Sequence, residues 1–463
     1  MADHPGSGEP QVRLERVDPR PVLAGGRSLL YVESSAAVGA ISSLDVVLGG
    51  RSHPTVAYPG PPGERPERRR FAAVIPVDSA LAPGAHELRL SARSTGDLGV
   101  VEHIEVVSDS RRAQAQEDAG ATEVPLVAIC LATHDPPGEL FERQIASIRA
   151  QSHQRFVCLI SDDVSEPRAW ERIERTVGGD SRFTVSRGAS RLGFYRNFER
   201  CLSLVPPVAS FVALADQDDH WHPDKLATLL AELDGQDALL AFSDLNVVSA
   251  DGRPIATSFW LDRTNNFTEL GTLLLSNTVT GAAALFRREL LDDVLPFPPD
   301  VGKPFHDHWI ACVALALGRI AYVDRPLYDY VQHPDNVLGQ PAQSDDLRGG
   351  LLHAIRRFAA DPRRRLATTA RSAGDTYRRD VVRLEIFART LELRLGDRIA
   401  RSQATDVRRA ARVGTSLRSL AWLLGRSARD VRGRSATLGV ENQLVKAIVW
   451  RHWHSLRARA RST

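Results

Sequence analysis

The chain has 463 residues, of which 43% are hydrophobic and 25% are charged, with a formal net charge of +2 at pH 7. A chain of this length and composition can bury more than one hydrophobic core, so two or three domains are expected. No uninterrupted apolar segment approaches the roughly 18 residues of a membrane-spanning helix, so the sequence predicts no transmembrane segment. The first residues, MADHPGSGEP, lack the basic start and apolar stretch of a signal peptide, and the four cysteines show no CxxC spacing. Both features are typical of a cytoplasmic protein with reduced thiols.

Residues 11–107 contain short runs of alternating polar and apolar residues, separated by turn sequences such as YPGPPGERPE and LAPGAH. This spacing predicts a small antiparallel β-sandwich of immunoglobulin-like architecture. No cluster of catalytic residue types occurs in it, so we expect either a carbohydrate-binding or docking module, or a folded spacer. Residues 1–10 are expected to be disordered, and the polar residues 108–123 to form a linker.

From residue 124 the pattern changes to strands that alternate with helices. PLVAICLA, FVCLIS and SFVALA are apolar runs typical of strands covered on both faces, and ELFERQIASIRAQ has the spacing of an amphipathic helix. This order predicts an α/β domain with a mostly parallel sheet over residues 124–345. Ligands bind such sheets beyond the carboxyl ends of the strands. The polar residues predicted there are Thr133, Asp162, Asp163, Asp216 and Asp218.

Three carboxylates, those of Asp216, Asp218 and Asp219, follow the strand sequence FVALA within four positions. Like charges at this spacing raise each other's pKa unless a counter-charge is present. A divalent cation with a preference for hard oxygen ligands would use the cluster as a ligand set, and a solvated acidic turn is the alternative. The position between a strand and a helix expected to start between Trp221 and Lys225 favours the metal.

Residues 346–463 are predicted to be helical and Arg-rich. Residues 351–463 contain 26 Lys+Arg against 9 Asp+Glu, whereas the first 350 residues contain 33 against 48. One apolar stripe, at spacings of four and three, is formed by Tyr377, Val381, Leu384, Ala388, Leu391 and Leu395. The last stretch, LVKAIVWRHWHSLRARARS, mixes apolar and aromatic residues with Arg and can lie in an anionic membrane surface. Packing on the acidic remainder of the chain and disorder are the alternatives.

Short segments in consistent order carry a family resemblance between residues 124 and 340. They are LATHD, ISDDVS, RLGFYRNFERC, LADQDDHWHPDKL, NTVTGAAALFRRE, HDHW and YVQHPDN. Together they resemble family 2 glycosyltransferases with the nucleotide-sugar-binding GT-A fold, most closely the rhamnosyltransferase-like members. The resemblance implies inverting transfer of a sugar, such as rhamnose, from a dTDP- or UDP-sugar to a cell-surface glycan or its lipid-linked precursor. The first 120 residues and the tail lie outside it.

The resemblance implies roles for individual acidic residues. Asp162 and Asp163 would hydrogen-bond the nucleobase and ribose, with a helix N-cap as the alternative role. Asp216 and Asp218 would hold Mn²⁺ or Mg²⁺ against the diphosphate of the donor. His333 would be a further metal or diphosphate ligand, and an imidazole ligand favours Mn²⁺.

Asp307 in HDHW matches the catalytic base of the family, because an inverting mechanism needs one carboxylate that takes the acceptor proton. Capping of the following helix is the alternative. His306 and His308 depart from the commoner HDWW-like form and could shift the pKa of Asp307 or tune acceptor choice. Gly281 would let the backbone approach the sugar closely, with a bulge as the alternative.

Four further residues, Thr133, Arg191, Arg196 and Asn197, would face the donor, the arginines through phosphate contacts. As the alternative, residues 191, 196 and 197 would be exposed helix residues.

Two other functions are weaker interpretations of the same sequence. A sugar-phosphate nucleotidyltransferase would need a Gly-rich phosphate loop after the first strand, which THDPPG does not supply. A catalytically inactive glycan-binding or scaffold protein would not need the acids at 216, 218 and 307. We therefore expect a bacterial enzyme of cell-envelope polysaccharide biosynthesis. It would be cytoplasmic or bound at the inner face of the membrane, with no nucleic acid partner.

Overall fold

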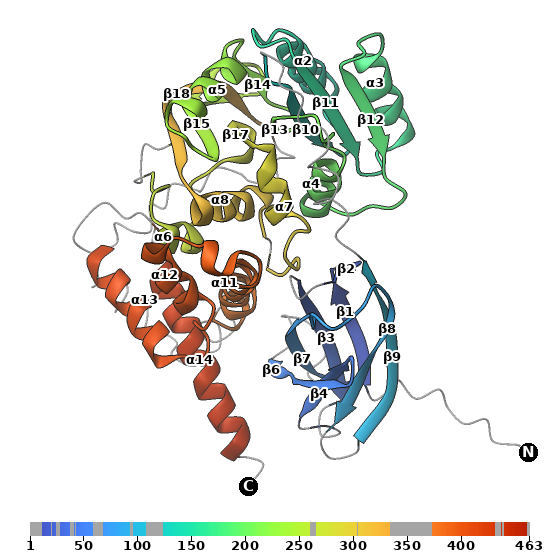
Figure 1. The fold of residues 1–463 in the computed structure, drawn as a ribbon, viewed down its shortest axis with the longest axis vertical. Coiled ribbons are helices and arrows are strands. Elements are labelled where there is room, and N and C mark those ends of the chain that lie inside the picture. The colour runs from blue at the N-terminus through green and yellow to red at the C-terminus, as the bar shows by residue number, and fades with distance from the viewer. Residues whose placement is uncertain are drawn as a thin grey trace, which may run out of the picture.

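The structure is a computed structural model of the 463-residue chain. It describes residues 12–19, 21–24, 28–37, 41, 43–58, 68–92, 96–107, 124–259, 265–302, 304–333, 373–430, 437 and 439–460. A strand-rich part (blue), an α/β part (green to yellow) and a helical part (orange to red) follow one another along the chain (Figure 1). The predicted disordered N-terminus and the predicted linker 108–123 lie outside the described residues.

The strand-rich part is a β-sandwich, as the alternating runs predicted. Its strands are β1 (Val12–Asp18), β2 (Val22–Leu23), β3 (Leu29–Ala37), β4 (Leu44–Leu48), β5 (Arg51–Pro54), β6 (Val56–Tyr58), β7 (Arg68–Pro76), β8 (Gly84–Ala92) and β9 (Gly96–Val107). One sheet has the order β1-β3-β7-β6 and the other β2-β9-β8-β4-β5. Inward-facing residues of both sheets, such as Val32, Phe71 and Leu88, form one core between them.

The α/β part is built on one sheet, whose strand bounds follow. They are β10 (Val127–Thr133), β11 (Phe156–Asp162), β12 (Phe183–Arg187), β13 (Phe211–Ala215), β14 (His220–Trp221), β15 (Leu240–Ser249), β16 (Pro254–Ala256), β17 (Ala284–Arg287) and β18 (Ile320–Gln332). The order is β12-β11-β10-β13-β17-β15-β18-β14, with β16 beside β15. From β12 to β13 the strands are parallel, but β17 is antiparallel to both of its neighbours. The expected α/β fold is confirmed. The sheet is mixed rather than mostly parallel, because β17 runs antiparallel to its neighbours. The sequence of β17 showed no strand pattern, so this strand was not expected.

The helices of this part are α2 (Gly138–Arg149), α3 (Pro167–Val177), α4 (Phe194–Ser203), α5 (Lys225–Gly235), α6 (Leu270–Leu275), α7 (Leu291–Val294) and α8 (His306–Leu317). Helix α4 packs on β10 and β11, and α5 packs on β15, β17 and β18. Helix α8 is buried along almost its whole length, as its sequence HDHWIACVALAL requires.

The C-terminal part consists of η4 (Tyr377–Val381), α11 (Val382–Leu395), η5 (Gly396–Arg398), α12 (Arg401–Ala410), α13 (Leu417–Asp430) and α14 (Val440–Ala460). The predicted apolar stripe of residues 377–395 is buried. Phe387 of α11 packs against the rings of His308 and Trp309 of α8, at centroid distances of 5.3 Å in each case. Helix α11 therefore packs against α8 (Figure 1).

Part of the basic charge of these helices is neutralised by the α/β part. The Arg398 guanidinium donates to the Asp293 carboxylate at 3.0 Å, and Arg394 donates to the carbonyl of Val294, also at 3.0 Å. Arg426 of α13 forms an ion pair of 2.8 Å with Glu269. Packing on the acidic remainder of the chain, one of the alternatives for the tail, is thus seen for these arginines.

Helix α14 is anchored by its first turns. Leu444 and Ile448 are buried, and Arg451 hydrogen-bonds the Tyr377 hydroxyl, so disorder is the wrong interpretation for this stretch. Val449 and Trp453 are 54% and 46% exposed. Within the ranges given above, none of the helices combines the length and the apolar character that crossing a bilayer requires.

Candidate active site

The acidic segment that follows β13 is tied to the neighbouring strand end. The Gln217 side chain accepts a hydrogen bond from the His134 backbone N–H at 2.9 Å and donates to the His134 carbonyl at 3.3 Å. The Gln144 side chain of α2 donates to the Asp216 carbonyl at 3.0 Å. The segment is therefore held at the carboxyl ends of β10 and β13, where a ligand of such a sheet binds.

The carboxylates of this segment lie in an unfavourable environment for negative charge. Burial, with the charges of Asp218 and Asp307, raises the pKa of Asp216 to about 7. Burial also raises the pKa of Asp218 and that of Asp219. Within the described residues, the Asp216 carboxylate accepts no hydrogen bond, and the Asp219 Oδ2 atom is buried without a partner. The cluster therefore lacks enough counter-charge from the protein itself.

This donor set fits a hard divalent cation in part. Carboxylate oxygens are the ligands that Mg²⁺ and Mn²⁺ prefer, and a cation would offset the mutual repulsion of Asp216 and Asp218. In the part of the chain that the structure describes, no three His, Cys, Asp or Glu side chains are grouped to hold an ion. His333 Nε2 instead lies 2.7 Å from Asp218 Oδ2, so these two side chains bind each other directly. A cation here would need further ligands from a diphosphate or from water.

A buried lysine lies beside the acidic cluster. Lys225, the first residue of α5, has its ammonium group 3.5 Å from the ring centroid of Trp221 and hydrogen-bonded to the Ala282 carbonyl. Burial lowers the pKa of Lys225, against the opposing charges of Asp219 and Asp216. We expected only a helix start at this position. The sequence did contain a signal for the burial of this side chain. Lys225 directly precedes the apolar run LATLLAEL, which places it on a buried helix end.

Asp307 lies in the first turn of α8 and is held by two other elements. Its Oδ2 atom accepts from the Gly281 backbone N–H at 3.0 Å, and its Oδ1 atom accepts from the Asn277 side chain, also at 3.0 Å. Burial raises its pKa to about 6. Phe305 is the N-cap of α8 and no side chain caps the helix, so Asp307 is not its N-cap residue. Gly281 donates to Asp307, and the next residue, Ala282, accepts from Lys225 beside the acidic cluster, so one short segment lies against both the candidate base and the cluster.

The histidines on either side of Asp307 are neutral. Burial lowers the pKa of His306 and that of His308 to about 3. The His306 ring stacks on Phe198 at a centroid distance of 3.7 Å, and His308 Nε2 lies 2.6 Å from the Leu273 carbonyl. Neither imidazole contributes to the raised pKa of Asp307. Their role in this structure is to pack and orient the start of α8.

Asp162 and Asp163 are both used inside the protein. Asp162 accepts from the Ser165 backbone N–H at 3.0 Å and from the Thr133 hydroxyl at 3.3 Å. Asp163 accepts from the backbone N–H groups of residues 192 and 193, at 2.6 and 2.8 Å. Neither is the N-cap of α3, whose N-cap is Glu166. Asp163 holds the loop that enters α4, and a contact of either acid with a nucleotide stays a prediction.

Two of the residues expected to face a donor point elsewhere. Arg196 is directed at the sandwich, where it forms an ion pair of 2.8 Å with Asp18, and it also pairs with Glu199 at 2.6 Å. Asn197 is buried and donates to the carbonyls of Ser161 and Thr133. Helix periodicity does not reveal which face of α4 meets the β-sandwich, and a contact of either residue with a donor stays a prediction. Arg191 is exposed.

Comparison with known families decides the class of the α/β part. Residues 129–295 match the family described as glycosyl transferase family 2. These residues form a family 2 glycosyl transferase domain. The predicted family is thereby confirmed, while the rhamnosyltransferase subtype stays a prediction. Asp307, at the start of α8, follows the matched residues in the chain.

Two solved structures have a distant likeness to this chain. TarS 1-349 of S. aureus, in complex with UDP-GlcNAc, has 14% identity over 72% of this chain and 92% of that chain, with a TM-score of 0.40. The mannosyltransferase PcManGT of Pyrobaculum calidifontis, in complex with GDP-Man and Mn²⁺, has 16% identity over 72% of this chain and 88% of that chain, with a TM-score of 0.36. No curated protein matches the chain.

Gly281 of the candidate site allows two segments to approach closely. A Cβ atom at this position would lie 2.8 Å from His306 Nε2 and 3.3 Å from Asp307 Cβ. Its neighbour His306 cannot easily move, because it is buried against Phe198. The close approach serves Asp307 directly, since the Gly281 N–H donates to that carboxylate.

We expect Gly281→Ala to lower the free energy of unfolding by about 1–3 kcal/mol, because the added methyl group overpacks the site. Transfer activity should fall by about tenfold or more, because the Asp307 carboxylate is displaced. Denaturant titration and initial rates measure the two effects. Gly235→Ala is the matched control, since nothing lies within 4 Å of a Cβ there. Equal behaviour of the two variants would refute the role assigned to Gly281.

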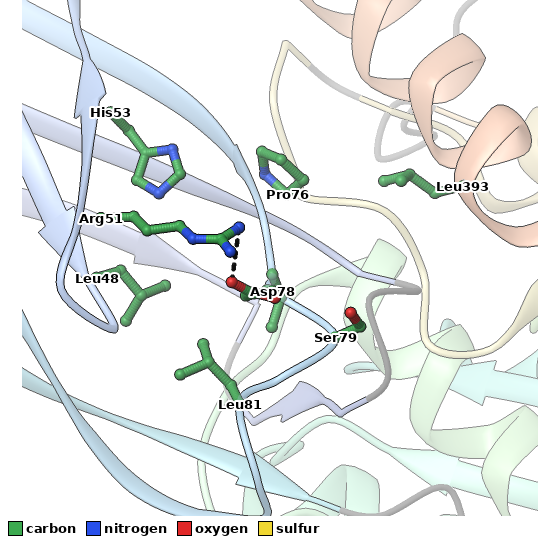
Figure 2. A pocket seen from close by; sticks show the side chains of 9 residues that line it. Leu48, Arg51, His53, Pro76, Asp78, Ser79, Leu81 and Leu393 are labelled. Atoms are coloured by element: carbon green, nitrogen blue, oxygen red, sulfur yellow. Dashed lines mark ion pairs between the residues drawn. The ribbon is translucent and has the colours of Figure 1, made fainter.

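A cavity of about 320 Å³ lies away from the acidic cluster, between the sandwich and α11 (Figure 2). Its lining residues are Leu48, Arg51, His53, Pro76, Val77, Asp78, Ser79, Leu81 and Leu393. Arg51 and Asp78 form an ion pair of 2.7 Å across it. Among the described residues that line it there is no Trp, Tyr or Phe.

Proposed function

We propose that the protein transfers a sugar, with inversion, from a nucleotide diphosphate sugar to a hydroxyl of a cell-surface glycan or its lipid-linked precursor. The donor is proposed to be a dTDP- or UDP-sugar, with rhamnose as the first candidate. The observation that carries the proposal is the shared site of Asp216 and Asp307. Asp216 directly follows β13, and Asp307 lies in α8. Gly281 donates to Asp307, and the adjacent Ala282 accepts from Lys225, whose charge acts on Asp216. Inverting transfer needs a site for the leaving diphosphate and a base in one place.

Different residues of the site are proposed to perform different parts of the reaction. Asp216 and Asp218 would hold a divalent cation, Mn²⁺ or Mg²⁺, whose positive charge would neutralise the leaving diphosphate. Asp307 would take the proton of the acceptor hydroxyl. Its pKa of about 6 leaves most of the carboxyl groups ionised at pH 7, and a base with a pKa near the working pH is the most efficient. The Gly281 N–H and the Asn277 amide orient this carboxylate.

Residues at the strand ends and in the loop before α4 are proposed to contact the donor. Arg191 is exposed on the loop that Asp163 holds, and its guanidinium is proposed to bind the donor phosphates. Asp162, Asp163 and Thr133 are proposed to form the wall of the nucleotide site. Arg196 and Asn197, like Asp162 and Asp163, would have to exchange hydrogen bonds within the chain for contacts with the donor.

A screen of nucleotide sugars by thermal shift, with and without Mn²⁺, tests the proposal. A donor present at about 100 times its dissociation constant stabilises the protein by about 2.7 kcal/mol, which is a readily measured rise in melting temperature. Donors that give a metal-dependent shift are then tested for hydrolysis. Binding without hydrolysis or transfer would favour an inactive scaffold, and diphosphate release from a nucleoside triphosphate with a sugar phosphate would favour a nucleotidyltransferase. No shift with any nucleotide sugar would refute the proposal.

We also propose that the C-terminal helices contact an anionic membrane surface. The support is the exposure of Val449 and Trp453 on α14, together with the excess of Arg and Lys in residues 351–463. Deletion of residues 440–463 would be a poor test, because it would uncover the packed surface around Leu444.

The double substitution Val449→Glu and Trp453→Glu is expected to weaken binding to anionic vesicles at low salt by at least severalfold. Two apolar contacts are lost and two negative charges are added at a surface that repels them. Vesicle sedimentation measures the change. Leu204→Glu, at a residue 42% exposed in the glycosyl transferase domain, is the control. If the wild-type protein ignores anionic vesicles at low salt, the membrane proposal is abandoned.

A further inference from the structure

One carboxylate of the sandwich joins it to two segments of the α/β part. Asp18 Oδ2, at the end of β1, accepts from Arg196 Nη2 at 2.8 Å and from the Asp300 backbone N–H at 2.6 Å. The side chains of Asp18 and Arg196 are only 16% and 14% exposed. A second ion pair, Arg16 to Asp300 at 3.4 Å, lies beside the first. Because the Asp18–Arg196 pair is largely shielded from water, salt screens it less than a surface pair.

The two segments that Asp18 binds are also tied to each other. Arg196 Nη2 donates to the Pro298 carbonyl at 3.1 Å, and Tyr195 donates to the same carbonyl at 3.2 Å. Glu199 Oε1 accepts from the Phe297 N–H at 2.6 Å. Helix α4 and residues 297–300 therefore form one hydrogen-bonded unit, and Asp18 closes it from the sandwich side.

Both parts of this unit lead to the candidate base. Phe305, the N-cap of α8, directly precedes His306 and Asp307, the first two residues of that helix. On α4, Phe198 stacks on His306 at 3.7 Å, and Phe194 lies 5.7 Å from Phe305, measured between ring centroids. The two residues immediately before Asp307 are thus packed against the helix whose Arg196 is bound by the sandwich.

We propose that Asp18 is a positioning residue through which the sandwich sets the placement of the Asp307 carboxylate. The proposal rests on the proposed function, since it assigns Asp307 a reaction to perform. It gives the sandwich a role that requires neither glycan binding nor a passive spacer. A carboxylate base displaced by about 1 Å from its working geometry can lose about a hundredfold in rate.

The test compares Asp18→Ala, Asp18→Asn and the control Asp78→Asn. Asp18→Ala removes both hydrogen bonds, whereas the Asn amide oxygen can still accept from the Asp300 N–H while the charge pairing with Arg196 is lost. Asp78 belongs to the same sandwich and pairs with Arg51 (Figure 2). We expect kcat to fall about tenfold in Asp18→Ala, less in Asp18→Asn and not in the control. The donor KM should stay within about twofold, since the acidic cluster is not displaced.

Hydrogen exchange provides a readout that does not depend on turnover. The amides of residues 297–308 and of α4 should exchange at least severalfold faster in Asp18→Ala than in the wild type, while the sandwich core keeps its protection. Unchanged kcat or unchanged exchange in these segments would overturn the proposal. An equal loss of kcat in Asp78→Asn would also overturn it, because the effect would then be a general loss of sandwich stability.

The two proposals can fail separately. If the wild-type protein turns over no donor, the proposed function fails, and the exchange measurement still shows whether Asp18 controls residues 297–308. If Asp18→Ala does not fold, Asp18→Asn and Arg196→Lys carry the same measurements. Arg196→Lys keeps the positive charge but cannot bind Asp18, Glu199 and Pro298 at once. A wild-type kcat in both of these variants would overturn the positioning role.

Discussion

Replacement of Asp307 by Asn is expected to lower kcat for sugar transfer by about 10²–10⁴-fold, because an amide cannot take the proton of the acceptor hydroxyl. Metal-dependent binding of the donor should be retained, since the acidic cluster after β13 is unchanged. Initial rates and titration calorimetry measure the two effects. Near-normal turnover would remove Asp307 from the mechanism.

The surroundings of Asp307 require a stability control for this variant. Its two oxygens accept from the Gly281 N–H and the Asn277 amide, so an Asn amide group would face at least one donor. We expect a cost of about 1–3 kcal/mol for that mismatch. Asp234→Asn, at a carboxylate 61% exposed that pairs with Arg287, is the matched control. Loss of kcat without loss of donor affinity or of folded protein is the decisive result.

The pH dependence of the wild-type rate checks the same assignment. Burial raises the pKa of Asp307 to about 6, and a base acts only when it is deprotonated. The rate should therefore rise with pH through about 6 and level off above it. In Asp307→Asn the residual rate should lack this rise. A wild-type rate that stays constant between pH 5 and pH 7, a range about one unit to either side of 6, would contradict the assignment.

The second large effect is expected for Asp218→Ala. Loss of one of two carboxylate ligands should weaken Mn²⁺-dependent binding of a nucleoside diphosphate by at least about tenfold, while binding without metal changes little. Calorimetry with and without Mn²⁺ measures the difference. An unchanged affinity in the presence of Mn²⁺ would count against the ligand assignment.

The contact between His333 and Asp218 makes a sharper comparison possible. If His333 is a metal ligand, His333→Ala should also weaken Mn²⁺-dependent binding. If it serves only as the partner of Asp218, at 2.7 Å, its removal should leave that binding within about twofold, because the carboxylate remains. We expect weaker binding, since an imidazole is a good ligand for Mn²⁺.

Much of the fold could be predicted because its signals are local. The apolar runs of β10, β11 and β13 form strands buried on both faces, and the stripe through Leu384 and Leu391 became the buried face of α11. Asp216 and Asp218 were placed at a strand end by their position after FVALA, and the structure puts them there. Hydrophobic periodicity reports which residues share a face of one element, so these features follow from the sequence.

The partners of polar side chains could not be predicted in the same way. Arg196 was expected at a donor phosphate and instead binds Asp18 of the sandwich. Lys225 begins α5, as predicted, but its burial beside the acids was not predicted. Each of these outcomes depends on a residue that is distant in the chain or on how fully the surrounding elements exclude water.

The sequence by itself determined the order of the three parts, the apolar cores and the family of residues 129–295, because each depends on patterns within short segments. Only the tertiary structure decided that β17 runs antiparallel, that α11 packs against α8, and that α4 connects the sandwich to the residues before Asp307. Strand direction and the packing of one element on another arise from contacts between distant segments. No period within a single segment encodes them.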